Sequence, residues 1–296
     1  MKVGIIGTGA MGKPMAHNIL KAGNSLVVYA RHPEKVRDLE GEGARIVASS
    51  ADVGVESEYI VLSLPFDPEV EEVVMGEKGI LSGASPGTLI LDTTTGSPKA
   101  AVEVAAATAE KGVAYLDAPI SGGVKGAVEA RVTFIVGGEK EAVKKAMPLM
   151  KQLGANVYHV GPVGIGRAVK ALNQIISALN TLTLCETVVL GKKLGVSPEA
   201  FYEVLSKCAA NSYHLKTKLP QFIIPGNFDG GHRIEMMIKD LEIALQVAKE
   251  NNASVMLTGL ATQMYRAGAT AGYATKDISA MVNFLGSFVD ISFSGK

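Results

Sequence analysis

Short β-rich runs alternate with helical segments through the first half of the chain, and this alternation constrains the fold more than any other feature. The runs begin with KVGII and SLVVY and continue to VYHVG, and many of the segments between them are rich in Ala, Glu and Lys. A strand, a helix and a second strand in this order form the βαβ unit of a largely parallel sheet. The sequence therefore predicts an α/β domain with a mostly parallel sheet over residues 1–162.

From about residue 163 the alternation stops and the pattern becomes helical. Four long stretches carry apolar residues at helical spacing, at residues 165–193, 198–208, 234–251 and 255–270. Gly and Pro separate these stretches, and no low-complexity linker divides the two halves. We therefore expect an all-α C-terminal domain over residues 163–296, joined to the first domain by a long interdomain helix.

The composition argues against several classes of protein. The 29 basic and 29 acidic residues cancel, so no overall field would attract nucleic acid or an anionic membrane. The two cysteines, Cys185 and Cys208, fit free thiols in a reducing compartment, and we expect no metal site. The start MKVGII lacks the features of a signal peptide, and no uncharged apolar run is long enough to span a bilayer. We expect a cytoplasmic enzyme or binding protein.

The motif GTGAMG at residues 7–12 lies between the strand KVGII and a following helix. Gly7 permits the tight turn, Gly9 lets a pyrophosphate approach the backbone, and Gly12 lets the helix pack closely on the strand. The N–H groups and dipole of that helix favour an anion. GxGxxG alone is weak evidence, but in this position it predicts a Rossmann-type dinucleotide site, formed by Gly7, Gly9, Ala10, Met11 and Gly12.

The end of the second β run, YARHPEK, bears on which dinucleotide is bound. An NAD site usually places Asp or Glu here to accept hydrogen bonds from the adenosine ribose, whereas this chain has Ala30, Arg31 and His32. Arg31 can pair with the 2′-phosphate of NADP and stack on adenine, so NADP is favoured. The alternative is an exposed loop arginine, with NAD held through the backbone.

A second glycine motif, DAPISGGVKGA, follows a later β run. Gly122 and Gly123 would leave backbone N–H groups open to a carboxylate or an oxyanion. Such a motif alone is more often only a turn. We expect it at the C-terminal end of a parallel strand, where α/β proteins bind ligands, and this position favours a binding site.

The segment GPVGIGRAVKALNQ places Lys170 in a helix that is otherwise mostly uncharged. A lone lysine of this kind is usually a solvated helix position. The polar residues that share its helix face are Asn173, Ser177 and Asn180. A buried polar stripe is costly without partners, so it should face a wet cleft or another polar surface. If the helix passes the nicotinamide, Lys170 can protonate a substrate carbonyl oxygen as hydride arrives, and Asn173 can orient the substrate.

Four motifs resemble the signatures of the β-hydroxyacid dehydrogenases. This family includes 3-hydroxyisobutyrate dehydrogenase, tartronate semialdehyde reductase, glyoxylate reductase and succinic semialdehyde reductase. The four motifs are GTGAMGKPMAHNILKAG, DAPISGGVKGA, GPVGIGRAVKALNQ and MIKDLEIAL, and they span nearly the whole chain. The resemblance implies a Rossmann domain followed by a helical domain, commonly in homodimers or homotetramers. It also implies reversible hydride transfer between NADP, or NAD, and a short β-hydroxyacid or its semialdehyde.

The resemblance further implies roles for individual residues at the substrate. Lys170 corresponds to the catalytic lysine of the family and Asn173 to its helper asparagine. The residues that correspond to the grip on the substrate carboxylate are Ser121, Gly122 and Gly123.

The cofactor residues implied by the resemblance lie in three other segments. Pro65, in YIVLSLP, and Thr95, in DTTTG, match loops that line the nicotinamide and its ribose. Lys239, in MIKDLEIAL, corresponds to a lysine that reaches toward the cofactor, although its helical position alone would predict an ordinary surface lysine. Asp240 also matches the family, and its role can be merely structural.

The chain departs from the family pattern at two places. Gln174 stands where the family often has a second asparagine. Where many members carry an aromatic or small residue, this chain reads GGHRIEMM, so His232 and Arg233 become candidates for the far end of the substrate, with Tyr213 as a further candidate. A surface loop histidine is an equal alternative for His232, and the identity of the substrate stays open.

Three rival functions follow from related scaffolds. Imine reductases resemble this chain but usually carry Asp or Tyr at the position of Lys170. A decarboxylating enzyme close to 6-phosphogluconate dehydrogenase would need a basic cluster for a sugar phosphate, which this chain lacks. A non-catalytic NADPH-binding protein would be expected to lose Lys170 or to add a basic targeting segment, and neither is seen.

Overall fold

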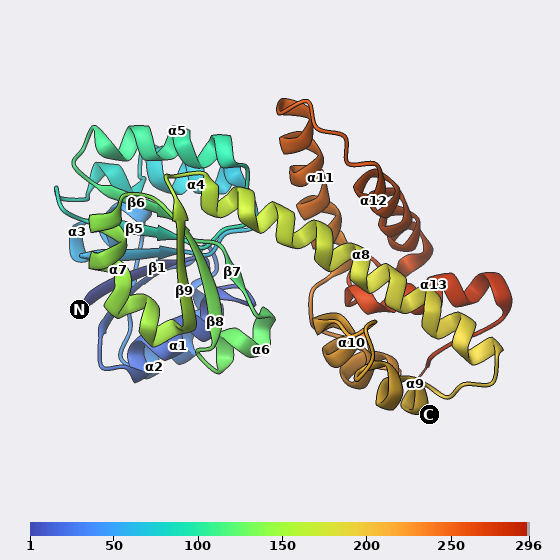
Figure 1. Ribbon diagram of the computed structural model, residues 1–296. Coiled ribbons are helices and arrows are strands. Elements are labelled where there is room, and N and C mark those ends of the chain that lie inside the picture. The colour runs from blue at the N-terminus through green and yellow to red at the C-terminus, as the bar shows by residue number, and fades with distance from the viewer. Residues whose placement is uncertain (295–296) are drawn as a thin grey trace. The chain divides into compact units, whose positions relative to one another are not determined.

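The computed structural model describes residues 1–294, and the chain divides into two compact units between Lys170 and Ala171 (Figure 1). The first unit contains a nine-stranded sheet within the described residues. Its six parallel strands are β3 (Arg45–Val47), β2 (Ser25–Tyr29), β1 (Lys2–Ile6), β4 (Tyr59–Leu62), β5 (Leu89–Asp92) and β6 (Ala114–Asp117), in this spatial order. The predicted mostly parallel sheet of the Rossmann type is confirmed.

The remaining three strands extend this sheet beyond β6. Strand β8 (Val132–Gly137) pairs antiparallel with β6 and with the two-residue strand β7 (Ile120–Ser121). Strand β9 (Gly154–Gly161) pairs parallel with β8. The parallel order is therefore broken only at the side of the sheet that carries the second glycine motif.

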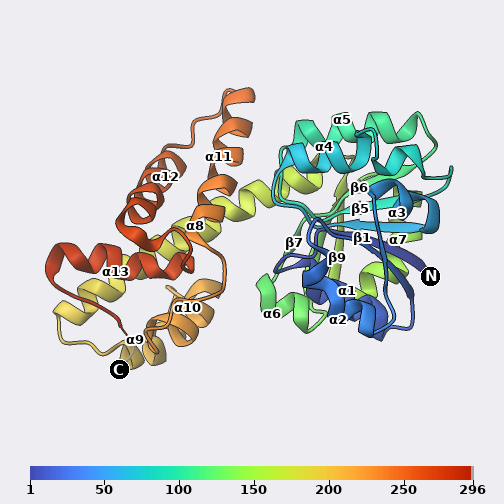
Figure 2. The ribbon, with the colours of Figure 1, turned by 180° about the vertical axis from the view of Figure 1, so that it is seen from behind.

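Helices cover both faces of the sheet (Figures 1 and 2). One face packs against α1 (Gly12–Lys21) and α7 (Lys140–Leu153), and the other packs against α3 (Ser50–Glu56), α4 (Asp67–Met75) and α5 (Pro98–Ala109). Successive strand residues point to opposite faces, so Val3 and Ile5 of β1 join one core and Ile6 joins the other. Strands that are buried on both faces read as continuous apolar runs, as KVGII does.

The strand order puts the switch point of the sheet between β1 and β4. The chain runs from β1 outward through β2 and β3, then returns to β4 and continues outward on the other side. The loops that follow β1 and β4 therefore diverge at the carboxyl edge of the sheet. Ligands of doubly wound α/β proteins bind at this kind of switch point.

The second unit is helical, as the sequence predicts. Its helices are α9 (Pro198–Leu205), α10 (Tyr213–Lys218), α11 (Ile234–Glu250), α12 (Met256–Gly268) and α13 (Met281–Gly286), together with most of α8 (Ile165–Lys193). Its core includes Leu182 and Val188 of α8, Leu241 of α11 and Tyr265 of α12. Serine caps begin two of the shorter helices, since the Ser197 and Ser212 side chains accept backbone N–H bonds at α9 and α10.

Helix α8 begins in the first unit and continues into the second. By length and composition alone it could cross a bilayer, with a mean hydropathy of 1.3 over its most apolar window. Half of that window is buried in the protein, and the core helix of a globular domain meets the same criteria.

Candidate active site

The glycine turn after β1 is sterically closed at two of its three glycines. Gly7 has a φ of +95°, and a Cβ atom there would lie 2.2 Å from the backbone oxygen of Ser63. A Cβ atom at Gly12 would lie 1.8 Å from the backbone oxygen of Gly7. Both positions therefore require glycine, because any side chain would push the turn away from β4 or α1 away from the turn.

The third glycine leaves open space in front of helix α1. A Cβ atom at Gly9 would meet nothing within 4 Å, and Ala10 beside it is exposed. The N-cap residue, Met11, makes no side-chain capping bond, and the first turn of α1 contains no acidic residue. Space, a positive helix end and no competing carboxylate fit the pyrophosphate of a dinucleotide.

Two loops that the resemblance assigns to the nicotinamide are held together by hydrogen bonds. Pro65 follows β4 and Thr95 follows β5, and both residues are half-buried. The backbone N–H of Leu64 donates to the Thr94 hydroxyl over 3.1 Å, and the Thr93 hydroxyl donates to the backbone oxygen of Leu62 over 2.6 Å. These bonds fix the two loops side by side at the carboxyl edge of the sheet.

The second glycine motif forms a turn with unusual backbone geometry. Ser121 pairs with Thr133 of β8, and the next residues, Gly122 and Gly123, have φ values of +129° and +65°. Two successive positive φ angles favour glycine, and a turn of this kind can present backbone N–H groups to an anion. One detail of the prediction is wrong, because Ser121 ends the antiparallel strand β7, whereas the parallel strand β6 already ends at Asp117.

A buried arginine that the sequence reading missed anchors the start of α8. Arg167 is 1% exposed, and its guanidinium donates to the Asp92 carboxylate over 2.6 Å and to the Asp67 carboxylate over 2.8 Å. It also donates to the backbone oxygen of Ser97 over 2.9 Å, and the Tyr115 hydroxyl donates to Asp92 over 2.5 Å. Such charge-assisted bonds in a buried site hold the first turn of α8 against the carboxyl ends of the strands.

A second buried carboxylate caps the same helix. Asp117, the register partner of Asp92, accepts backbone N–H bonds from Gly164 over 2.9 Å and from Arg167 over 2.8 Å. Burial raises the pKa of Asp117 to about 6, although the two N–H bonds act in the opposite direction. The signal in the sequence was that β5 and β6 each end in Leu-Asp, since parallel strands bring their carboxyl ends together.

Lys170 lies one helical turn after Arg167 on α8. Lys170 is 7% exposed, so it does not occupy the solvated helix position that a lone lysine usually has. Positions three apart share a helix face, so the anchor at Arg167 fixes the direction in which the Lys170 position faces. By contrast, Leu172 and Ile176, also on α8, are 60% and 61% exposed.

In the second unit, a polar network centres on Asp240, which Gln174, Lys239 and His232 contact directly. The Asn173 amide donates to Gln174 over 2.8 Å, and the Gln174 amide donates to Asp240 over 2.5 Å. The Lys239 amine lies 3.0 Å from the Asp240 carboxylate, and Nε2 of the His232 ring lies 3.3 Å from it. Asp240 therefore has at least a structural role, and the ring of His232 faces this carboxylate while its side chain is 36% exposed.

The rest of the polar stripe on α8 also finds partners in the second unit. His214 lies between the hydroxyls of Ser177, 2.9 Å from Nε2, and Thr181, 3.2 Å from Nδ1. Because the Thr181 hydroxyl donates to the Ser177 backbone oxygen, Nδ1 donates and Nε2 accepts. Burial, together with the nearby Lys218, lowers the pKa of His214 to about 4. Tyr213 is 64% exposed.

Apart from Lys170, which lies near the start of α8, the predicted site residues form three groups. The cofactor residues Gly7 to Gly12, Arg31, Pro65 and Thr95 follow neighbouring strands of the first unit. The substrate turn, Ser121 to Gly123, lies beside β8 in the same unit. Asn173, His232 and Lys239 gather around Asp240 in the second unit, and their roles toward substrate and cofactor stay predictions.

Comparison with known proteins supports both units. Residues 2–161 match the family described as the NAD binding domain of 6-phosphogluconate dehydrogenase. Residues 164–285 match the family described as 'NAD-binding of NADP-dependent 3-hydroxyisobutyrate dehydrogenase'. A 2-(hydroxymethyl)glutarate dehydrogenase from Eubacterium barkeri is 37% identical over 100% of this chain and 98% of its own length.

Two further relatives agree with these matches. The human mitochondrial 3-hydroxyisobutyrate dehydrogenase is 33% identical over 96% of this chain and 86% of its own length. The solved structure of a Mycobacterium tuberculosis 3-hydroxyisobutyrate dehydrogenase with L-serine covers 96% of this chain and 98% of its own, with 29% identity and a TM-score of 0.86. The chain therefore belongs to the β-hydroxyacid dehydrogenase family, whose members are NAD(P)-dependent enzymes that act on CH–OH groups.

Proposed function

We propose that this protein interconverts a short β-hydroxyacid and its semialdehyde with NADP, and that Lys170 is the general acid and base. The observation that carries the proposal is the burial of Lys170, which is 7% exposed on a helix whose first turn is locked by Arg167. Lysine is among the residues least often buried, so a buried lysine next to a fixed anchor suggests a chemical role.

Each group of residues has one task in this reaction. When bound, the nicotinamide supplies or accepts the hydride. The Ser121 hydroxyl and the N–H groups at Gly122 and Gly123 bind the substrate carboxylate and so fix the reacting carbon. Lys170 gives a proton to the carbonyl oxygen during reduction and takes it from the hydroxyl during oxidation, and Asn173, one turn further along α8, orients the substrate.

The expected magnitudes are those of positioning and proton transfer. Positioning of a substrate at a preformed turn can lower a barrier by several kcal/mol, up to roughly 7 to 11 kcal/mol in ideal cases. A general acid or base contributes about 10² to 10⁴ in rate. In the proposed reaction the protein therefore contributes substrate positioning and proton transfer.

The preference for NADP rests on Arg31. This residue follows β2 and is exposed, and neither neighbour in the sequence is a carboxylate. A guanidinium can pair with the 2′-phosphate of NADP in fork geometry. We expect Arg31→Ala to lower the ratio of kcat/KM with NADPH to that with NADH. If the wild-type protein prefers NADH by more than about tenfold, corresponding to about 1.4 kcal/mol, this role of Arg31 is wrong.

The reaction class is tested by measuring NADPH oxidation against a panel of substrates. The panel contains the semialdehydes of succinate, methylmalonate and tartronate, together with glyoxylate and cyclic imines. Reduction of one or more acid aldehydes supports the proposal. Reduction of imines alone would identify an imine reductase, and tight NADPH binding without turnover on any substrate would identify a non-catalytic binding protein.

We further propose that a second copy of the chain covers the apolar surface of the second unit. Exposed large apolar side chains gather on this unit, among them Leu172, Ile176, Leu190, Leu194, Met256, Leu257, Leu260 and Phe288. Large apolar side chains left exposed in such numbers are typical of an interface between subunits. Light scattering should give a mass of two or four times 30.9 kDa. A monomer mass at micromolar protein concentration would contradict this assignment.

A further inference from the structure

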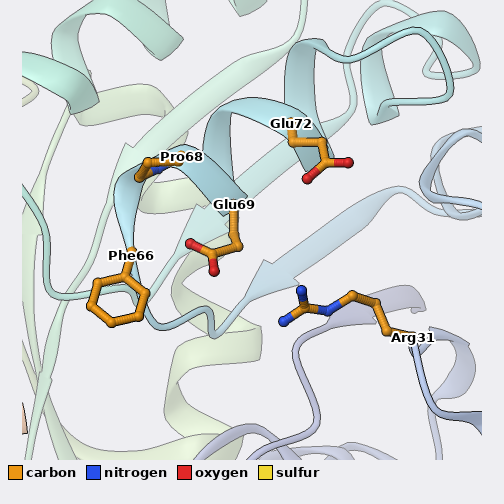
Figure 3. Close-up of a pocket in the computed structure, with 5 residues that line it drawn as sticks. All are labelled: Arg31, Phe66, Pro68, Glu69 and Glu72. Carbon is orange, nitrogen blue, oxygen red and sulfur yellow. The ribbon is translucent and has the colours of Figure 1, made fainter.

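A cavity of the first unit lies between the loop after β2 and the start of α4 (Figure 3). Its volume is about 470 Å³, which is within the range of small-molecule sites. Its lining residues are Arg31, Phe66, Pro68, Glu69 and Glu72. Arg31 is the residue to which the proposed function assigns the adenosine end of the cofactor.

The charges in this cavity oppose one another. One guanidinium and two carboxylates line it, so the lining carries a net negative formal charge. Figure 3 shows the Arg31 side chain extending from one wall toward Glu69 on the opposite wall, with Glu72 further along the same helix. Within residues 1–294 no ion pair neutralises Arg31. The carboxylates therefore remain available to act on a charged ligand.

The apolar part of the lining would contact a portion that NADP and NAD share. The carboxylates, by contrast, would act on the 2′-phosphate, in which the two cofactors differ. Phe66 and Pro68 offer a surface for the adenine ring, which the two cofactors share. The 2′-phosphate, which NADP alone carries, has a charge of about −1.5 to −2 near pH 7, as phosphate monoesters do. Nearby carboxylates repel this charge, but they can accept hydrogen bonds from the neutral ribose hydroxyls of NAD.

We propose that Glu69 and Glu72 restrain the preference for NADP that Arg31 creates. This inference rests on the proposed function, because it assumes that the cavity receives the adenosine ribose. The carboxylate that an NAD site places at the end of its second strand is missing from this chain, and α4 supplies two carboxylates from the opposite wall. The pair lowers the affinity for NADP without lowering the affinity for NAD.

The helix offers a matched control for this proposal. Glu69 and Glu72 are three residues apart, so they share one face of α4. Glu71 lies between them in the sequence but is not part of the cavity lining. Neutralising Glu71 removes the same charge from the same helix without changing the cavity.

The experiment measures binding and turnover in Glu69→Gln, Glu72→Gln, the double variant and Glu71→Gln. Calorimetry gives the Kd of adenosine 2′,5′-bisphosphate and of adenosine 5′-monophosphate, and kinetics give kcat/KM for NADPH and NADH. We expect each cavity substitution to raise the preference for the 2′-phosphorylated ligand by about two- to fivefold, the range for exposed charge interactions. Glu71→Gln should leave the preference unchanged, and about 1 M salt should reduce the effect, because the Debye length is then about 3 Å.

Two outcomes separate this inference from the proposed function. If the double variant folds normally and binds both adenosine ligands with the wild-type ratio, or with a lower ratio, the role of the two glutamates is refuted. If Arg31→Ala leaves the ratio unchanged, the proposed role of Arg31 fails instead. The adenosine ligands need no substrate, so the result does not depend on knowing which hydroxyacid is used.

Discussion

At the scale of single residues, Arg167 determines where the proposed catalytic lysine lies. Its guanidinium bonds to Asp92 and Asp67, and its own backbone N–H bonds to Asp117. The position of Lys170 three residues later follows from these contacts, since a helix is rigid over one turn. The helix begins at Ile165, inside the glycine-rich segment GPVGIG, which has little intrinsic order of its own.

We predict that Arg167→Met lowers the free energy of unfolding by about 3 to 5 kcal/mol, because it leaves buried carboxylates without their cation. Arg131→Met is the matched control, since the Arg131 side chain is 67% exposed and pairs with Glu129 on the surface. The control should change stability by less than about 1 kcal/mol. Urea unfolding measures both values, and equal stability of the two variants would contradict the anchoring role.

The glycine turn gives a second prediction at this scale. Gly9→Ala should keep the wild-type midpoint of thermal unfolding, because the added Cβ meets nothing within 4 Å. The same variant should bind NADP at least about tenfold more weakly, since the methyl group would occupy the space of the pyrophosphate. Gly12→Ala should lose stability instead, because its Cβ would lie 1.8 Å from the Gly7 oxygen.

Gly41→Ala provides the control for Gly9→Ala. A Cβ atom at Gly41 also meets nothing within 4 Å, and this residue lies in α2 (Arg37–Gly41), outside the turn. Calorimetric titration with NADP should give the wild-type Kd for this variant. Wild-type affinity in Gly9→Ala would show that the pyrophosphate does not lie against the turn.

At the scale of elements, α8 carries a polar stripe whose partners come from α10 and α11. Asn173 connects through Gln174 to Asp240, and Ser177 bonds to His214. The sequence predicted the stripe and its need for partners, because helical spacing alone places these residues on one face. It did not predict the partners, since their contacts join residues that are far apart in the chain.

His214 makes part of the stability of the second unit dependent on pH. Its folded pKa of about 4 lies below the ordinary value of 6.5, so the folded protein binds fewer protons than the unfolded chain between these values. The contribution of neutral His214 is therefore complete above about pH 6.5 and is lost as the pH falls toward 4. We predict that, as the pH falls from 6.5 to 4, the free energy of unfolding of the wild type decreases by up to about 3 kcal/mol more than that of His214→Asn.

The comparison with a variant is needed because Asp117 acts in the opposite sense. Its folded pKa of about 6 exceeds the ordinary 3.8, so its contribution is present at low pH and is lost as the pH rises through about 6. Urea unfolding of the wild type, of His214→Asn and of the exposed control His32→Asn at several pH values isolates the histidine. Parallel pH curves for the wild type and His214→Asn would contradict the assignment.

At the scale of the whole molecule, local patterns predicted the architecture better than the details of the site. The parallel sheet and the helix Ile165–Lys193 follow from periodicities that a short stretch already carries. The antiparallel strand β7 is only two residues long, too short to leave a pattern. Arg167 reads as an ordinary helix residue, because its burial depends on Asp67 and Asp92, which are 100 and 75 residues away.

In the proposed mechanism, the amine of Lys170 gives and takes the proton at the substrate oxygen. Lys170→Ala and Lys193→Ala remove one amine each from α8, and Lys193 is an exposed residue at the end of that helix. The measurement is kcat for NADPH-dependent reduction of the best semialdehyde, alongside the Kd for NADPH. We predict that Lys170→Ala lowers kcat by at least about a hundredfold with a nearly unchanged Kd, while Lys193→Ala matches the wild type. Near-normal turnover in Lys170→Ala would contradict the account.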